Sequence, residues 1–203
     1  MASTSTSLLR WLGTALVCVA AAAAAGPAGD AHADDQSPAP LPAFAPHQSD
    51  WQPNYTVFPY NLWQSRVTPE QVTAEREACQ WFNAQYNSLM GQVFGFQHYL
   101  AGRGDDWSAP GVRAAASTVQ ANLDQSAAFL DPRARTLFIV NYPDQSQYSP
   151  LYNGDSFHHL WYQFTQISDK MSQEMVSGVI NANIATANVY GNTIRDSGVC
   201  DFA

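Results

Sequence analysis

The sequence predicts an all-α protein, an up-down helical bundle of three to four helices with an extended, Pro-rich N-terminal arm and one disulfide. Three observations predict this fold. Apolar residues recur at helical spacing in three long stretches, six prolines fall within residues 38–59, and two cysteines remain once a leader is removed. The expected boundaries are a signal peptide at 1–33, the arm at 34–67 and the bundle domain at 68–203.

The first 33 residues have the pattern of a signal peptide. Arg10 is the only charge before an apolar run from Trp11 to Ala25, which is too short to span a bilayer comfortably. The sequence Ala31-His32-Ala33 supplies the small residues that signal peptidase needs, so cleavage is expected before Asp34. The residues before Cys18 make a poor lipobox, which leaves lipidation of Cys18 as the less favoured alternative. We expect a secreted or cell-envelope protein with no transmembrane anchor after cleavage.

The charge of the chain argues against two classes of partner. The formal net charge is −8 at pH 7, and Arg10 and Asp30 cancel, so the charge survives cleavage. Lys170 is the only lysine. Nucleic acids and anionic membrane surfaces are bound by clustered positive charge, so neither is expected as a partner.

The arm is expected to be extended because its prolines exclude regular helix. The part up to Pro46 has little to bury, so we expect it to be mobile. The second half of the arm is aromatic. Its aromatic residues are Trp51, Tyr55, Phe58, Tyr60 and Trp63. We expect them to lie along the bundle and fill a groove, and the alternative is an exposed aromatic surface for a partner or a glycan.

The longest helical pattern covers residues 68–102. Thr68 and Gln71 form a capping box around Pro69, which suits the first helical position, and Gly102 is a natural stop. The apolar stripe of this helix consists of Cys79, Phe82, Tyr86, Leu89, Val93, Phe96 and Leu100. At about 1.5 Å per residue the helix is roughly 50 Å long, so the other helices should pack against it.

Two further helices complete the predicted bundle. An alanine-rich helix should open at Ser108 and end at Asp131-Pro132. Residues 137–140 follow as a short helix or irregular core segment; a strand is the alternative, but no second strand pattern exists to pair with it. One last long helix should start at Asp155 or Ser156 and end near Tyr190 or Gly191.

Cys79 and Cys200 are predicted to form the disulfide, because an even pair outside the cytoplasm is most simply joined; two buried free thiols are the alternative. The bond would require the last helix to end where the first begins, so these two helices should run antiparallel. The segment 131–154 must then return to the opposite end of the bundle.

That topology would gather polar chemistry at one end. His98 closes the first helix, and His158 and His159 open the last, with Asp105 and Asp155 in the adjoining loops. These residues are the candidate site for a metal, or with the surrounding aromatic rings for a haem-like ligand. The competing interpretation is that the histidines are caps or surface groups, since adjacent helical residues point about 100° apart.

A second candidate is a groove at Gly91, Gly95 and Trp161. The two glycines make a G-x-x-x-G step inside a helix, which costs about 1 kcal/mol each relative to alanine. Close packing of another helix explains such a step most simply. The alternative is a groove that admits the arm, a ligand or a partner.

Searches for catalytic patterns find no supported constellation. Gly154-Asp155-Ser156 matches the nucleophile block of GDSL-type hydrolases, but it lacks the preceding strand and the late Asp-x-x-His pair. None of the glutamates has a histidine three residues on, and HExxH and CxxC are absent from the sequence. We therefore expect no enzymatic activity and no obligatory cofactor.

The phrase from Thr73 to Asn83, TAEREACQWFN, together with the Ala-rich leader and the Asp-Asp mature start, resembles exported cell-envelope proteins of mycobacteria and related actinobacteria. This resemblance implies an exported protein of the bacterial cell envelope. Because no catalytic constellation is found, we expect a non-enzymatic binding or interaction protein, with an envelope protein or a small apolar ligand as its partner. The alternative is a secreted carrier of haem, metal or lipid that uses the His- and aromatic-rich end of the bundle. The sequence leaves the oligomeric state open.

Overall fold

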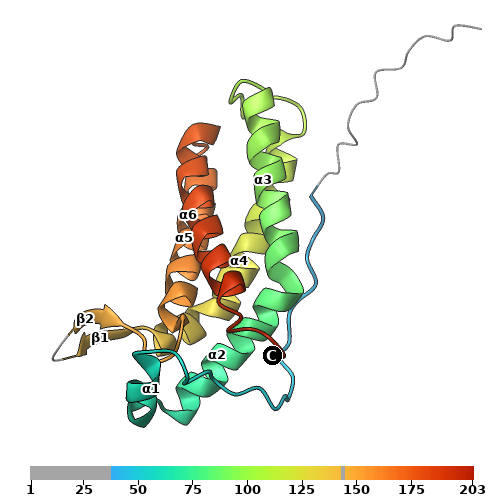
Figure 1. The fold of residues 1–203 in the computed structure, drawn as a ribbon. Helices are drawn as coiled ribbons and strands as arrows, with labels where there is room; N and C mark the ends of the chain where they lie inside the picture. Colours follow the sequence, from blue (N-terminus) through green and yellow to red (C-terminus); the bar gives the residue numbers. More distant parts are fainter. Residues whose placement is uncertain (1–37, 143–144) are drawn as a thin grey trace, which may run out of the picture. The chain divides into compact units, whose positions relative to one another are not determined.

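A computed structural model describes residues 38–142 and 145–203, so the predicted signal peptide, its cleavage site and Cys18 lie outside the described residues. The described chain is an all-α bundle with an extended N-terminal arm (Figure 1). Its elements are α1 (Tyr60–Trp63), the 3-10 turn η1 (Gln64–Arg66), α2 (Pro69–Trp81), the π-helical turn η2 (Phe82–Tyr86), α3 (Asn87–Gly102), α4 (Val112–Leu137), β1 (Ile139–Tyr142), β2 (Gln145–Tyr148), α5 (Gly154–Ser172) and α6 (Ser177–Asp196).

The first long helix is confirmed from cap to stop. The Thr68 hydroxyl accepts from the Gln71 N–H at 3.3 Å, and the Gln71 side chain accepts from the Thr68 N–H at 3.0 Å. Helix α2 continues through η2 into α3 without a break, ending at Gly102. The π-helical turn, with its wider i→i+5 pattern, is a feature that the apolar spacing does not reveal.

The predicted disulfide between Cys79 and Cys200 is present, with the two Cα atoms 4.8 Å apart. It joins α2 to the segment that follows α6, so α6 ends beside the first helix and runs antiparallel to it. The up-down-up-down order is confirmed, with α2–α3, α4, α5 and α6 as its four members (Figure 1).

Helix α4 is shifted relative to the prediction. It begins at Val112, after Gly111 in the left-handed conformation, and it runs through Pro132 to Leu137. A proline inside a helix removes one hydrogen bond, and we had expected the helix to end there. The last turn is instead anchored by Ala134 and Leu137, which are fully buried.

The expectation for residues 137–140 is wrong. Ile139–Tyr142 form strand β1, which pairs antiparallel with β2, with Ile139 opposite Tyr148 and Val140 opposite Gln147. The partner strand, Gln145–Tyr148, is mostly polar and carries no strand pattern, which is why the strand alternative was set aside. The hairpin also means that residues 131–154 do not return to the opposite end of the bundle (Figure 1).

The prediction of a single last helix is also wrong. This part of the chain forms two antiparallel helices, α5 and α6, which pack closely on each other. Glu174 adopts a left-handed φ of 51° in the turn between them. The apolar spacing of Met171, Met175 and Val179 passes through this turn and mimics one continuous helix. Only Met171 is buried, whereas Met175 and Val179 are exposed.

The described part of the arm, from Pro38, packs along the bundle, as the favoured interpretation predicts, although Phe58 is exposed. Its first described residues are hydrogen-bonded to the bundle, which the expectation of a segment with little to bury does not include. The Leu41 N–H donates to Asn122 Oδ1 at 2.9 Å. The Pro42 carbonyl accepts from Gln85 Nε2 at 2.5 Å and from Gln125 Nε2 at 3.0 Å. Side-chain amides on α4 and η2 therefore hold the arm's backbone, which hydrophobicity alone cannot anticipate.

The later part of the arm is held in the same way. Gln80 is buried, and its amide both donates to the His47 carbonyl and accepts from the His47 N–H, each at 3.0 Å. Trp51 is buried, and its indole N–H donates to the Val199 carbonyl at 3.1 Å. This contact places the arm next to the disulfide-bonded tail.

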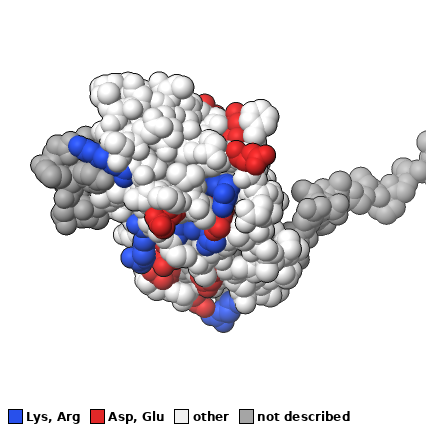
Figure 2. All heavy atoms as spheres, turned by 90° about the horizontal axis from the view of Figure 1, so that it is seen from below, with Lys and Arg blue, Asp and Glu red and all other residues white. Residues whose placement is uncertain are grey.

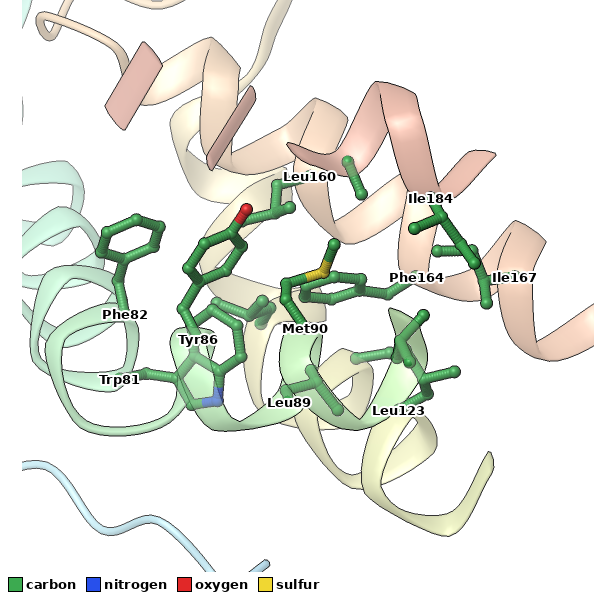
Figure 3. Packing of buried hydrophobic residues seen from close by; sticks show 14 of the residues in the cluster. Trp81, Phe82, Tyr86, Leu89, Met90, Leu123, Leu160, Phe164, Ile167 and Ile184 are labelled. Atoms are coloured by element: carbon green, nitrogen blue, oxygen red, sulfur yellow. The ribbon is translucent and has the colours of Figure 1, made fainter. Parts of the chain in front are cut away.

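The core lies between the helices and is rich in large side chains (Figure 3). Trp81, Phe164 and Leu123 are fully buried and come from α2, α5 and α4. The rings of Trp81 and Phe164 meet edge to face with their centroids 5.9 Å apart. Burial of such residues supplies most of the stability of the bundle.

Candidate functional site

The bundle has two distinct ends. The loop end is where residues 103–111 meet the turn 173–176, and the arm end is where α1, the hairpin and the start of α5 lie (Figure 1). His98 is exposed in α3 near the loop end, whereas His158 and His159 lie near the start of α5 at the arm end. At about 1.5 Å per residue, some 20 Å of α5 separates His158 from the loop end. The predicted gathering of the three histidines is therefore wrong, because the last helix folds back on itself.

The two predicted carboxylates are divided in the same way. Asp105 Oδ1 accepts from the Ser177 N–H at 2.8 Å, so it caps the start of α6 at the loop end. Asp155 lies in the first turn of α5 at the arm end. Within residues 38–142 and 145–203, no three His, Cys, Asp or Glu side chains gather as metal ligands would. The predicted metal or haem site is not assembled.

The predicted close packing at Gly91 and Gly95 is also wrong. Both glycines are exposed, and no other atom lies within 4 Å of the position that a Cβ would take. Trp161 belongs to α5, which makes its main contacts with α4 and α6. The close approach occurs instead at Gly191 of α6, where a Cβ would overlap the Tyr86 hydroxyl.

A cluster of rings at the arm end does unite three of the predicted residues. We call it the aromatic–histidine row. Its members come from the end of α4, the start of α5 and the end of α6, and apart from the exposed Arg135 they are half-buried. They are Arg135, Phe138, His158, His159, Trp161 and Tyr190.

Contacts between neighbouring rings fix the geometry of the row. Phe138 stacks on His158 with centroids 3.8 Å apart and planes at 9°. His158 meets Trp161 at 5.3 Å, and His159 stacks on Tyr190 at 4.8 Å. The Arg135 guanidinium lies 4.8 Å from the centre of the Trp161 ring, within the range of a cation–π interaction.

The electrostatics of the row keep one histidine neutral. Burial, followed by the neighbouring His159 and Arg135, lowers the pKa of His158 to about 4. Its Nδ1 atom is buried and has no hydrogen-bond partner among the described residues. At neutral pH the His158 ring, at the centre of the row, is therefore uncharged, and Arg135 lies at the edge of the row in an ion pair with Asp131.

The charged groups around the arm end are largely paired. Figure 2 shows Lys and Arg side chains lying next to Asp and Glu side chains, with uncharged surface around them. Arg135 pairs with Asp131 at 2.9 Å, and Arg133 pairs with Glu77 in the wall of a hollow of about 390 Å³ between α2 and α4. Arg133 and Arg135 are both ion-paired, so the row differs from the hollow in its aromatic rings rather than in unpaired charge.

Sequence reasoning found three members of the row and missed the rest. His158 and His159 belong to the predicted metal or haem site, and Trp161 belongs to the predicted groove with Gly91 and Gly95. Phe138 was assigned to the core, and Arg135 and Tyr190 received no role. Their connection depends on where α4 ends and on the α5–α6 turn, and neither has a local signal in the sequence.

No family model, curated protein or solved structure matches the chain. Within the part of the chain that the structure describes, no helix has both the length and the apolar character needed to cross a membrane.

Proposed function

We propose that this chain is an exported, non-enzymatic interaction protein of the bacterial cell envelope, and that the aromatic–histidine row is its binding surface for a protein partner. The row carries the proposal. Tryptophan, tyrosine and arginine are the residues that most often dominate the energy of protein–protein interfaces. The row contains one tryptophan, one tyrosine and one arginine. Two histidines and Phe138 lie between or beside them and link them through ring contacts.

The arrangement of the row favours binding in a second way. Its rings already stack on one another, so little side-chain freedom is lost when a partner covers them. A neutral His158 also reduces the penalty for removing water from the centre of the surface. A partner with apolar side chains facing the rings, and a carboxylate that shares the Arg135 guanidinium with Asp131, would fit this surface.

Three features support the exported location. The Cys79–Cys200 disulfide is of the kind that persists in oxidising compartments. The predicted signal peptide and the resemblance to actinobacterial envelope proteins point the same way.

The proposal is tested by retention of proteins from an envelope extract of the native host. The wild type, Trp161→Ala and Tyr162→Ala are immobilised with the disulfide intact. Tyr162 is the matched control, because it is the next residue on α5 but makes no ring contact with the row. We expect one protein to be retained by the wild type and by Tyr162→Ala, and to bind Trp161→Ala at least about 30-fold more weakly.

Two results would contradict this proposal. One is equal retention by the wild type and Trp161→Ala at matched thermal stability. The other is retention that polysaccharide hydrolases abolish and proteases do not, which would identify the partner as a glycan.

A further inference from the structure

Glu75 is the most unusual polar residue of the described chain. Its side chain is 0% exposed, and neither carboxyl oxygen has a hydrogen-bond partner among the described residues. Burial, and secondarily the charge of Asp155, raises its pKa well above the ordinary value. A buried polar group without a hydrogen-bond partner destabilises the folded state. Such a group needs an explanation beyond the packing of the helix that carries it.

The groups that interact electrostatically with Glu75 come from three other segments. Asp155 belongs to the first turn of α5, Tyr60 to α1 and Tyr55 to the arm, while Tyr152, in the loop before α5, contacts Tyr60. Burial, Asp155, Tyr152 and Glu75 together raise the pKa of Tyr60 to about 12, while a hydrogen bond from the Asn153 backbone opposes them. Burial and then Glu75 also raise the pKa of Tyr55. The two carboxyl groups therefore lie within electrostatic reach of the tyrosines.

Aromatic rings enclose this cluster from the side of α1. Tyr60 meets Trp63 and Tyr152 edge to face, with centroids 5.2 and 5.1 Å apart. Trp63 in turn lies 4.2 Å from Tyr148. The surroundings of the two carboxyl groups are thus aromatic rather than rich in further carboxylates.

This composition distinguishes between two kinds of cation. Calcium needs six to eight oxygen ligands and magnesium an octahedral set, yet the described residues contain no group of three or more His, Cys, Asp or Glu that could hold a metal. Carboxylates combined with tyrosine and tryptophan rings are the means by which proteins bind alkylammonium groups. The chemistry favours an organic cation over a metal ion.

We propose that Glu75 and Asp155 bind a small organic ammonium cation beneath α1, with Tyr60, Tyr152 and Trp63 forming its aromatic wall. The cation takes the place of the proton on Glu75, which is released to solvent, so the charge in the buried site remains balanced.

Access to the site requires movement of α1 and η1, and the structure makes such movement inexpensive. Neither element contains a buried residue, and Phe58 and Leu62 are 74% and 64% exposed. The segment is anchored on either side, by buried Trp51 and by the Thr68 capping box. Segments with few buried contacts open at low free energy, so residues 54–67, none of which is buried, can lift between fixed anchors.

The test is isothermal titration of the mature protein, disulfide intact, with tetramethylammonium chloride at pH 6, 7.5 and 9, and with sodium chloride as the salt control. We expect affinity to increase with pH as Glu75 ionises. We also expect one proton to be released per cation bound, measured by comparing buffers of different ionisation enthalpy. A structural role for Glu75 alone would produce neither signal.

Four variants make the test specific. Glu75→Gln keeps the shape of the side chain, so the fold should persist while affinity falls at least about tenfold and the proton release disappears. Tyr60→Phe keeps the ring and should bind within about twofold of the wild type, whereas Tyr60→Leu should lose about tenfold. Phe58→Ala changes an outward-facing side chain and should bind normally.

Several outcomes overturn the proposal. Undetectable binding at pH 9, with no shift in the thermal midpoint, is one, and unchanged affinity in Glu75→Gln is another. Equal affinity of Tyr60→Phe and Tyr60→Leu for tetramethylammonium would show that the Tyr60 ring does not contribute to binding, so the proposed aromatic wall would be wrong. If the protein bound calcium in a manner that depends on Glu75 and did not bind tetramethylammonium, the ligand would be a metal ion and the proposal of an organic cation would be wrong.

Discussion

The two ends of the bundle differ in whether their polar side chains have hydrogen-bond or ion-pair partners. At the loop end, Asp105 caps α6, and the Trp107 indole N–H donates to the Met175 carbonyl at 3.1 Å. Arg113 and Glu174 form an ion pair at 2.8 Å across the same end. At the arm end, Glu75, Asn153 and His158 each bury a side-chain atom that has no partner among the described residues.

This difference separates structural chemistry from functional chemistry. The polar groups of the loop end satisfy one another, so they explain how the α5–α6 turn is held. Buried groups without partners lower stability, and natural proteins keep such groups mainly where function requires them. The comparison supports the two proposals that place binding at the arm end, where the aromatic–histidine row and the Glu75 site lie at separate positions.

The largest expected effect comes from removing the disulfide that braces the arm end. Cys79 and Cys200 are 121 residues apart, and a cross-link closing a loop of this length contributes about 4–5 kcal/mol in the chain-entropy account. Replacing both with serine should lower the free energy of unfolding by about that amount, measured with urea. Amide hydrogen exchange should accelerate first near Trp51 and Val199, which meet beside the bond, and last at the loop end.

Reduced wild-type protein is the control for that variant. Its unfolding free energy should match that of the double-serine protein. A loss below about 1 kcal/mol would show that packing alone holds the arm end together.

Smaller changes in stability are expected when either of two glycines, which lie in different surroundings, is replaced by alanine. Gly191→Ala places a methyl group against the Tyr86 hydroxyl, and overpacking of this kind costs about 1–3 kcal/mol. Gly91→Ala meets no atom within 4 Å and should stabilise its helix by up to about 1 kcal/mol. Thermal midpoints should therefore move in opposite directions. Equal destabilisation by both changes would contradict the packing described here.

Much of the fold could be predicted because its signals are local. The capping box at Thr68, the apolar stripe of the first helix and the cysteine pair each depend on residue types at fixed spacings, and each is confirmed. The α5–α6 turn could not be predicted in this way. It is held by Asp105 and Trp107, which are distant in sequence and act through backbone contacts.

The missed α5–α6 turn also explains why the candidate site was predicted at the wrong end of the bundle. Reading α5 and α6 as one helix placed His158 at the wrong end, next to His98. Glu75 was noticed only as a glutamate without a histidine three residues on. Glu75 is completely buried by parts of the chain outside α2, and no residue pattern within α2 predicts that burial.

The smallest expected effects test the contrast between the ends most directly, through opposite responses to pH. Hydrogen bonds from Ser177 lower the pKa of Asp105, so its contribution to stability is present above the unfolded pKa near 3.8 and is lost as the pH falls through the folded pKa. The pKa of Glu75 is raised, so the unfolded state binds fewer protons above pH 4.5, and stability falls as the pH rises from there. Each effect should disappear in the corresponding neutral variant.

The measurement is the difference in unfolding free energy between variant and wild type from pH 2 to 9, which cancels the groups that they share. Asp105→Asn should be less stable than the wild type at pH 7 and should approach it at pH 2. Glu75→Gln should match the wild type near pH 4 and become progressively more stable as the pH rises. If both differences had the same slope, the unpartnered carboxyl group at the arm end would be no different from the capped one at the loop end, and the assignment of binding to the arm end would lose its physical basis.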